Sequence, residues 1–142
     1  MFSTIKLLFL VNLTPIILMA NPFVDAGERY GIDPWLLYSI AKVESGLNPL
    51  ALGKNTNGTY DMGIMQINTC HHKTLAKFGI SKEDLWNPET NINVGAWVLA
   101  GCVKRNGYTT KAIDCYNGDK TGRYSRKVLL AFNKEVVKWQ SK

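Results

Sequence analysis

Residues 33–46 read DPWLLYSIAKVESG, and this stretch indicates a mainly helical fold class. Asp33 can cap the free backbone amides of a helix, and Pro34 suits the first helical position, where no backbone N–H is needed. A helix is predicted from there to about Ser45, and Gly46 can end it. Similar helix start and stop signals recur along the chain, so the sequence predicts a mainly helical protein.

One acidic residue, Glu44, falls in the middle of the apolar face of this predicted helix. Three apolar residues share that face at about 3.6 residues per turn: Leu37, Ile40 and Ala41. The other side carries Lys42, Ser39 and Trp35. Burial disfavours a charged carboxylate and raises its pKa, which suits a general acid. The alternative is a glutamate that bends outward at the helix end or pairs with a buried cation, and periodicity alone does not decide.

The remainder of the chain predicts further helices around one small β element. Lys54–Tyr60 reads KNTNGTY, whose Asn57-Gly58 pair is a hairpin-type turn, so a β-hairpin is predicted near residues 54–62. A helix is expected after Asp61–Asn68 and on to Phe78. The other expected helices are Asn21-Pro22 to Gly31, Asn87-Pro88 to Asn106, Thr109 or Thr110 to before Asn117-Gly118, and Tyr124 onward. In the last one, core packing is expected for Val128, Phe132, Val136 and Trp139.

Length and composition favour one exported domain. The chain has 142 residues, enough for one domain with a core, and a formal net charge of +6. Residues 1–20 combine a charge at Lys6, the largely apolar Leu7–Met19 and the small Ala20, which is the pattern of a signal peptide. An uncleaved anchor is the alternative, since Leu18 is large for its position. Either way, residues 21–142 are predicted to form one exported, periplasmic domain.

Three cysteines lie in this domain. Export into an oxidising compartment favours one disulfide. Cys102 and Cys115 flank a short helix–turn–helix region and are the better pair, and a bridge from Cys70 to either one is the alternative. A zinc site at Cys70, His71 and His72 is poor chemistry, because three consecutive residues rarely point at one metal. No metal site is therefore predicted.

A second carboxylate and several amides follow the predicted hairpin. Asp61 could face Glu44 across a cleft, and two facing carboxylates are the minimum for glycoside cleavage. The alternative is that Asp61 only caps the next helix. Gln66 and Asn68 in the run GIMQIN can bond sugar hydroxyls and acetamido groups, or can tie the loop together. The same two interpretations hold for Asn91, Asn93, Tyr116 and Asn117.

Four strings in this chain together resemble a known family. They are AKVESGLNP (residues 41–49), GTYDMGIMQIN (58–68), NPETNINVGAWVLA (87–100) and YNG (116–118). In this order they are similar to small lytic transglycosylases of the soluble-lytic, lysozyme-like type. The nearest look-alikes are the small exported members that accompany type III and type IV secretion systems and conjugation. The resemblance covers nearly all of the predicted mature chain, from about Phe23 to the last helix.

The resemblance implies a lysozyme-like fold and cleavage of the β-1,4 bond from N-acetylmuramic acid to N-acetylglucosamine. Glu44 matches the family's catalytic glutamate, which would protonate the leaving oxygen and then take the proton of the muramic 6-hydroxyl as a 1,6-anhydro ring closes. Asp61 would stabilise the developing positive charge, since its string also resembles the DYGI-x-QIN run of animal-type lysozymes. Asn91 and Asn93 would brace the fold. The residues expected to bind the glycan are Ser45, Met65, Gln66, Asn68, Tyr116 and Asn117.

The chain departs from the family pattern in two ways. Secretion-linked members often carry one cysteine near the mature N-terminus and another in the Asn-Pro segment, where this chain has Phe23 and Glu89. Both are absent together, as expected if they form one bridge, so the fold would rest on Cys102–Cys115 instead. The string YNG, at residues 116–118, lacks the alanine of the usual Tyr-Asn-Ala-Gly.

The predicted function is a lytic transglycosylase that opens the cell wall locally for a secretion or conjugation apparatus. One alternative is a hydrolytic muramidase of the lysozyme type. Another is a non-catalytic wall-binding assembly module, which the presence of Glu44 disfavours. The expected partners are peptidoglycan strands and secretion or conjugation proteins, and not nucleic acid. The chain is expected to be a monomer, and its chemistry requires no cofactor.

Overall fold

The computed structural model describes residues 21–141, so the predicted signal peptide at residues 1–20 lies outside the described part of the chain. None of the helices in this range is long and apolar enough to cross a membrane. The described elements, in chain order, are α1 (Pro22–Tyr30), α2 (Pro34–Ser45), β1 (Leu52–Lys54), β2 (Tyr60–Met62), β3 (Ile67–Asn68), η1 (Thr69–His71), α3 (His72–Ala76), η2 (Glu83–Trp86), α4 (Pro88–Asn106), α5 (Thr110–Asn117) and α6 (Arg123–Gln140). The prediction of a mainly helical fold with a small β element is confirmed.

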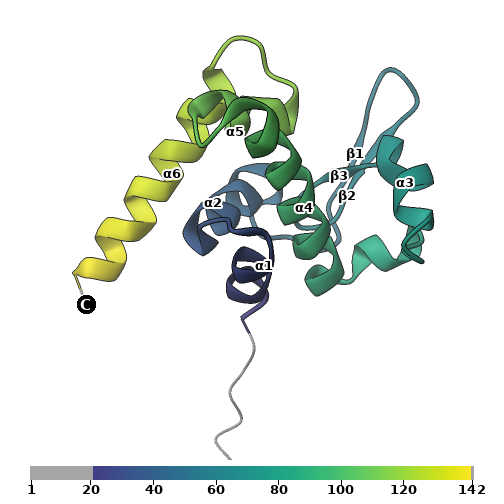
Figure 1. Ribbon diagram of the computed structural model, residues 1–142, viewed down its shortest axis with the longest axis horizontal. Helices are drawn as coiled ribbons and strands as arrows, with labels where there is room; N and C mark the ends of the chain where they lie inside the picture. The colour runs from purple at the N-terminus through teal and green to yellow at the C-terminus, as the bar shows by residue number, and fades with distance from the viewer. Residues whose placement is uncertain (1–20, 142) are drawn as a thin grey trace, which may run out of the picture.

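Helix α2 lies at the centre of the molecule, in contact with α1, α4 and α6 (Figure 1). Its start follows the sequence signals, because Asp33 Oδ1 accepts hydrogen bonds from the backbone amides of Trp35 and Leu36 at 2.7 and 3.3 Å. The predicted apolar face is fully buried at Leu37, Ile40 and Ala41. Ser39 is buried as well, against expectation, because helices pack on more than one side of α2. Its hydroxyl is satisfied within the helix by the Trp35 carbonyl at 2.7 Å.

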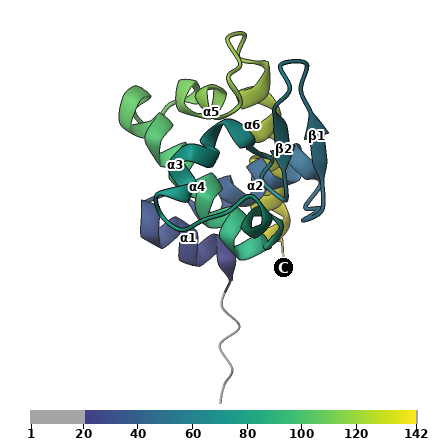
Figure 2. The same cartoon turned by 90° about the vertical axis from the view of Figure 1, so that its right-hand side faces the viewer.

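The sheet is a three-stranded antiparallel ribbon in the order β1-β2-β3. Its strands β1 and β2 lie side by side in Figure 2. Its register places Gly53 and Asn68 on either side of Asp61 in the central strand. The hairpin was predicted, but β3 was not. Gly63 and Gln66 adopt positive φ angles of 77° and 50°, which turn the chain back so that β3 pairs with β2. The expected helix running to Phe78 is therefore shorter, and α3 ends at Ala76.

Helix α6 lies on the side of the molecule opposite the sheet, and its second half extends past the other helices (Figure 1). In its first half Tyr124 and Val128 are buried in the core. Of the other residues of the predicted apolar stripe, Phe132 and Val136 are partly covered, whereas Trp139 is 64% exposed. The prediction of core packing is thus wrong for Trp139. The end of the helix extends beyond the elements that cover its first half.

Two tertiary links hold the helices around α2. Cys102 of α4 and Cys115 of α5 form a disulfide with Cα atoms 5.8 Å apart, while Cys70 is exposed and outside any disulfide. Lys42 of α2 forms an ion pair with Glu135 of α6, whose side chain is buried. Because of these links, the C-terminal end of α2 is tied to α6, and the end of α4 is tied to α5.

Candidate active site

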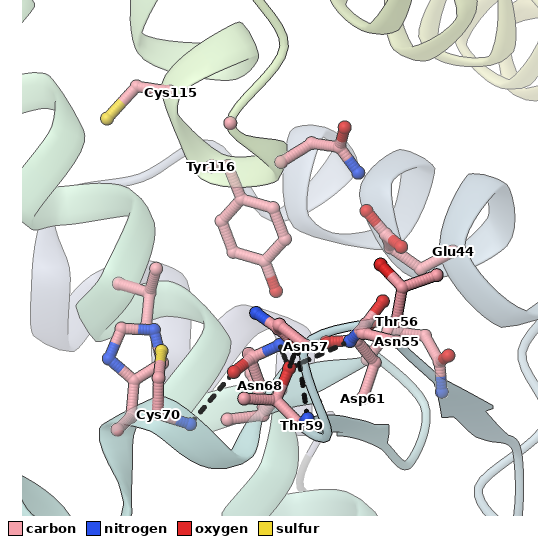
Figure 3. A pocket seen from close by; sticks show the side chains of 16 residues that line it. Glu44, Asn55, Thr56, Asn57, Thr59, Asp61, Asn68, Cys70, Cys115 and Tyr116 are labelled. Atoms are coloured by element: carbon pink, nitrogen blue, oxygen red, sulfur yellow. Dashed lines mark hydrogen bonds between the residues drawn. The ribbon is translucent and has the colours of Figure 1, made fainter.

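A cavity of about 660 Å³ opens between the helices and the sheet (Figure 3), and we call it the groove. Glu44, near the C-terminal end of α2, and Tyr116 of α5 lie on its helical side. The opposite side comes from the β1–β2 loop with Asn55, from β2 with Asp61 and from β3 with Asn68. Two acids thus line one polar groove, and they come from different elements.

Glu44 is the partly buried acid of the helical side. The hydroxyl of Tyr124 donates a hydrogen bond to its Oε1 at 2.5 Å. Burial raises the pKa of the Glu44 carboxyl, and the charge of Asp61 adds to this effect, while hydrogen bonding by Tyr124 and Asn117 opposes it. The net effect is a raised pKa, so Glu44 keeps its proton to a higher pH than an ordinary glutamate. That property is what a general acid requires near neutral pH.

Asp61 is held differently, by two side-chain amides on its own side of the groove (Figure 3). Its Oδ1 accepts a hydrogen bond from Asn68 Nδ2 at 2.7 Å, and its Oδ2 accepts one from Asn55 Nδ2 at 2.9 Å. The alternative that Asp61 caps a helix is wrong, because Asp61 lies inside β2 and strand β3 follows. Both oxygens of Asp61 are therefore held by neutral amide donors on the sheet side of the groove.

The loop between β2 and β3 is anchored on a buried amide of α4. Asn91 Oδ1 accepts a hydrogen bond from the Met65 amide at 2.8 Å. Its Nδ2 donates to the carbonyls of Met62 and Leu85, each at 2.8 Å. Asn91 therefore braces the fold, as expected. The Asn93 amide does not link α4 to another element in this way. It lies on another side of α4 and donates to the Glu89 carbonyl of the same helix.

Two predicted glycan-binding residues, Ser45 and Met65, do not line the groove. The Ser45 hydroxyl donates to the Ile64 carbonyl at 2.6 Å and accepts from the Asn48 amide at 3.1 Å. The Met65 side chain is fully buried against α4, where a Cβ on Gly95 would collide with its sulfur. Both side chains hold the β2–β3 loop against α2 and α4, and a role for them in glycan binding stays a prediction.

The other predicted binding residues do line the groove, and their own hydrogen bonds fix them. Gln66 Nε2 donates to the carbonyls of Ala51 and Gly63, both at 3.0 Å, which leaves Oε1 to accept a bond from a ligand. The Tyr116 hydroxyl donates to the Met65 carbonyl at 2.8 Å, and burial raises its pKa well above the usual value, so it stays neutral. These residues, with Asn68 and Asn117, offer hydrogen-bonding groups suited to a polar, uncharged ligand.

Two residues that hold the acids have no predicted role in the sequence. Tyr124 was expected only at the start of the last helix, yet it bonds Glu44 from 80 positions away. Asn55 was placed in the predicted hairpin without a role, yet it bonds Asp61. The Asn55 contact follows from hairpin pairing and could have been inferred from the register. Tyr124 carried no comparable signal, since only the packing of α6 against α2 brings it to Glu44.

The chain is similar to known proteins over most of its length. The family model described as "Transglycosylase SLT domain" matches residues 21–135. Invasion protein IagB of Salmonella typhimurium strain LT2 is 37% identical over 123 residues, which cover 81% of this chain and 77% of that protein. Protein IpgF of Shigella flexneri is 36% identical over 120 residues, covering 84% of this chain and 78% of that protein.

A solved structure shows the same fold. The lytic transglycosylase Slt of Pseudomonas aeruginosa, in the form of an inactive glutamate-to-glutamine mutant, aligns with a TM-score of 0.66 at 22% identity. The match covers 81% of this chain but 24% of Slt, so the chain corresponds to about a quarter of that larger protein. The family model and the two relatives span most of the described residues, and on that basis the chain belongs to the SLT transglycosylase family of peptidoglycan lytic transglycosylases.

Proposed function

We propose that this enzyme cleaves the β-1,4 bond between N-acetylmuramic acid and N-acetylglucosamine in the groove, with Glu44 as its acid and base. The observation that carries the proposal is the state of Glu44, a partly buried carboxyl with a raised pKa in a polar groove that Asp61 also lines. By contrast, hydrogen bonds hold the pKa values of Asp84, Asp119 and Glu135 below their usual range. The inactive glutamate-to-glutamine mutant of Slt is in keeping with a required glutamate.

The reaction is a proton relay through one carboxyl. Protonated Glu44 donates its proton to the glycosidic oxygen as the bond from that oxygen to the muramic C1 breaks. The muramic 6-hydroxyl oxygen then bonds to C1, and its proton returns to the Glu44 carboxylate. One bond to C1 breaks and one forms, the acid is regenerated, and no water is consumed. The products are a strand with a 1,6-anhydromuramoyl end and a strand with a free 4-hydroxyl on N-acetylglucosamine.

In this proposal Asp61 acts by charge alone. As the leaving oxygen departs, positive charge develops on the muramic ring, and a fixed anion in the same groove stabilises it. Asn55 and Asn68 hold the Asp61 carboxylate in place, so it need not reorganise during the reaction. Gln66, Asn68, Tyr116 and Asn117 serve the binding of sugar hydroxyls and acetamido groups along the groove.

The cellular role in the proposal is local opening of the cell wall for a secretion or conjugation apparatus. Support comes from the resemblance to small exported members of the family and from relatives such as IagB, which is named an invasion protein. The enzyme would act in the periplasm as a monomer after removal of residues 1–20. A disulfide between Cys102 and Cys115 suits that oxidising compartment.

Mass analysis of digested peptidoglycan tests the proposal. The purified mature enzyme should release fragments with 1,6-anhydromuramoyl ends. Reducing muramic ends would overturn it in favour of a hydrolytic muramidase, a candidate that Asp61 favours because lysozymes use a carboxylate in the similar string. Binding without any scission would indicate a wall-binding module. Glu28→Gln, a change of an exposed carboxyl on α1, serves as the matched control for Glu44→Gln.

A further inference from the structure

A second cavity, of about 210 Å³, lies apart from the groove, and we call it the aromatic cavity. None of the described residues lines both hollows. Three separate segments contribute a ring to its lining, namely Tyr30 at the end of α1, Phe78 after α3 and Trp97 of α4. A typical small-molecule site has roughly 300–1,000 Å³, so this smaller cavity suits a single ring-sized unit.

One of these rings is left open to solvent. Phe78 is 70% exposed, whereas Leu75, which lines the same cavity, is buried in the core. Removal of apolar surface from water is favourable, and the fold leaves most of the Phe78 ring uncovered. An exposed ring at the edge of a cavity is therefore a surface that a ligand can cover.

One polar atom at this cavity lacks a partner. Asn93 of α4 lines the cavity, and its Oδ1 is buried yet accepts no hydrogen bond from any group of residues 21–141. The other end of the amide is engaged, because Nδ2 donates to the Glu89 carbonyl at 3.1 Å. A buried acceptor without a donor costs stability, since it has lost its bonds to water. The missing donor is one that a ligand with an N–H group supplies.

The aromatic cavity is connected to the groove through a pair of rings. Trp97 packs edge-to-face with His71, and their ring centroids lie 6.0 Å apart. His71 lines the groove, as does Val98, the residue that follows Trp97 in α4. A glycan strand that leaves the groove at His71 therefore meets Trp97 and the aromatic cavity next.

We propose that the aromatic cavity binds an N-acetylhexosamine unit of the glycan strand, as a second site outside the groove. This inference rests on the proposed function for the identity of the polymer. The rings of Tyr30, Phe78 and Trp97 cover the apolar C–H face of the sugar. Its acetamido N–H supplies the donor that Asn93 Oδ1 lacks, and the exposed guanidinium of Arg29 donates to the sugar oxygens.

A second site changes how the enzyme holds its substrate. Once one part of a strand is bound in the groove, the rest of that strand is at a high effective concentration near the aromatic cavity. Long glycan strands should therefore bind more tightly than short oligosaccharides that occupy one site at a time. The enzyme should also stay on a long strand between successive cuts.

Binding is tested with the Glu44→Gln enzyme, so that no strand is cut. The probe is N,N′,N″-triacetylchitotriose, a trimer of N-acetylglucosamine, and NMR follows the side-chain amides of Asn93 in the aromatic cavity and Asn68 in the groove. Both amides should shift, each with its own binding curve. Phe78→Ala should weaken the Asn93 curve about tenfold. Tyr108→Ala, the matched control at an exposed ring that lines neither hollow, should leave it unchanged.

A second variant, Asn93→Leu, separates binding from a structural role. It keeps the approximate shape of the side chain and removes the unpaired acceptor, so the free energy of unfolding should stay the same or rise. Affinity at the aromatic cavity, now followed at the Trp97 indole N–H, should fall about tenfold. Loss of stability with unchanged affinity would overturn the proposal.

The two amides also separate this inference from the proposed function. A shift at Asn68 without one at Asn93, or unchanged curves in both Phe78→Ala and Asn93→Leu, would overturn the second site and leave glycan binding in the groove intact. A shift at Asn93 alone would support the second site and contradict glycan binding in the groove. No shift at either amide would overturn both.

Discussion

The helical and sheet sides of the groove hold their acids by opposite means. Glu44 on α2 is partly buried, its burial raises its pKa, and one phenol hydroxyl from α6 bonds it. Asp61 on β2 has both oxygens bonded by amides of its own sheet and the adjoining loop. A desolvated acid can give and regain a proton, whereas an anion held by neutral donors is stabilised as a fixed charge.

The two acids also differ in how far along the chain their hydrogen-bond partners lie. Tyr124 reaches Glu44 from 80 positions away along the chain, while Asn55 and Asn68 lie within seven positions of Asp61. The environment of Glu44 therefore depends on the docking of α6 onto α2, and that of Asp61 depends on hairpin register. Substitutions on either side of the groove should therefore differ in their effect on activity and on stability.

Glu44→Gln should have the largest effect, because it removes the proton that the helical side supplies. We expect at least a 10³-fold loss of kcat, roughly the contribution of a general acid and base. Glycan binding should survive, since glutamine keeps the shape of the side chain. Zymogram clearing and release of anhydromuropeptides measure the loss, with Glu28→Gln as control. Clearing at the wild-type rate would remove Glu44 from the mechanism.

The same variant should alter stability in a pH-dependent manner. Because the pKa of Glu44 is raised in the folded state, its stabilising contribution is full below its unfolded pKa and is lost as the pH rises through its folded pKa. Glu44→Gln does not titrate, so its stability relative to wild type should increase from pH 4 to pH 8. Urea unfolding of both proteins at pH 4 and pH 8 measures the difference in their free energies of unfolding. The same difference at both pH values would contradict a raised pKa for Glu44.

Asn91→Ala should be the most damaging change to the loop that forms the sheet side. It leaves the Met65 amide and the Met62 and Leu85 carbonyls without their buried partner. We expect a loss of about 3 kcal/mol in the free energy of unfolding. Urea denaturation measures it, and Asn93→Ala is the matched control, because that residue's hydrogen bond stays within α4. Equal losses of unfolding free energy in the two variants would show that the hydrogen bonds of Asn91 do not stabilise this loop.

Asp61→Asn should lower kcat about 10-fold to 100-fold, less than the change at Glu44, because it removes a fixed charge but no proton transfer. The exposed Asp25→Asn on α1 controls for net charge. Steady-state kinetics on purified peptidoglycan measure the effect. A wild-type rate would show that Asp61 has only a structural role in the sheet. A loss as large as that of Glu44→Gln would contradict the view that Asp61 contributes a charge but no proton transfer.

Tyr124→Phe should have the smallest effect, about a severalfold loss of kcat. Its hydroxyl bonds the carboxylate and lowers the pKa of Glu44, so its removal should raise that pKa further. The alkaline limb of the kcat/KM profile, which reports the loss of the acid's proton, should move to higher pH. Tyr116→Phe is the control, because its hydroxyl bonds the Met65 carbonyl, and it should leave the limb in place. A shift to lower pH in Tyr124→Phe would contradict the assignment.

The helices were the most predictable part of this molecule, because their ends are set by local chemistry. The predicted helix from Pro34 to Ser45 coincides with α2, since Asp33 caps its start and Gly46 adopts the left-handed conformation at its end. The segment after Asp61 was less predictable. Its strand β3 is two residues long and forms only because the chain turns at Gly63 and Gln66. Such a short strand has no periodicity of its own to detect.

The placing of the expected binding residues was partly predictable. Ser45 and Met65 are expected in the site from the family resemblance, yet neither lines the groove. Successive residues of a helix or an extended loop point in different directions. Ser45 and Met65 therefore face the body of the protein, where Ile64 and Gly95 meet them.

Capping signals and motif strings act through neighbouring residues, so the sequence was enough to predict a helical lytic transglycosylase with Glu44 as its candidate acid. What surrounds that acid depends on tertiary packing. The docking of α6 brings the hydroxyl of Tyr124 to its carboxyl. The pairing of β2 with β3 brings Asn68 to Asp61. These contacts set the pKa of Glu44 and the geometry around both acids. They arise when segments pack against each other, and the sequence of one segment alone does not indicate which other segment it will contact.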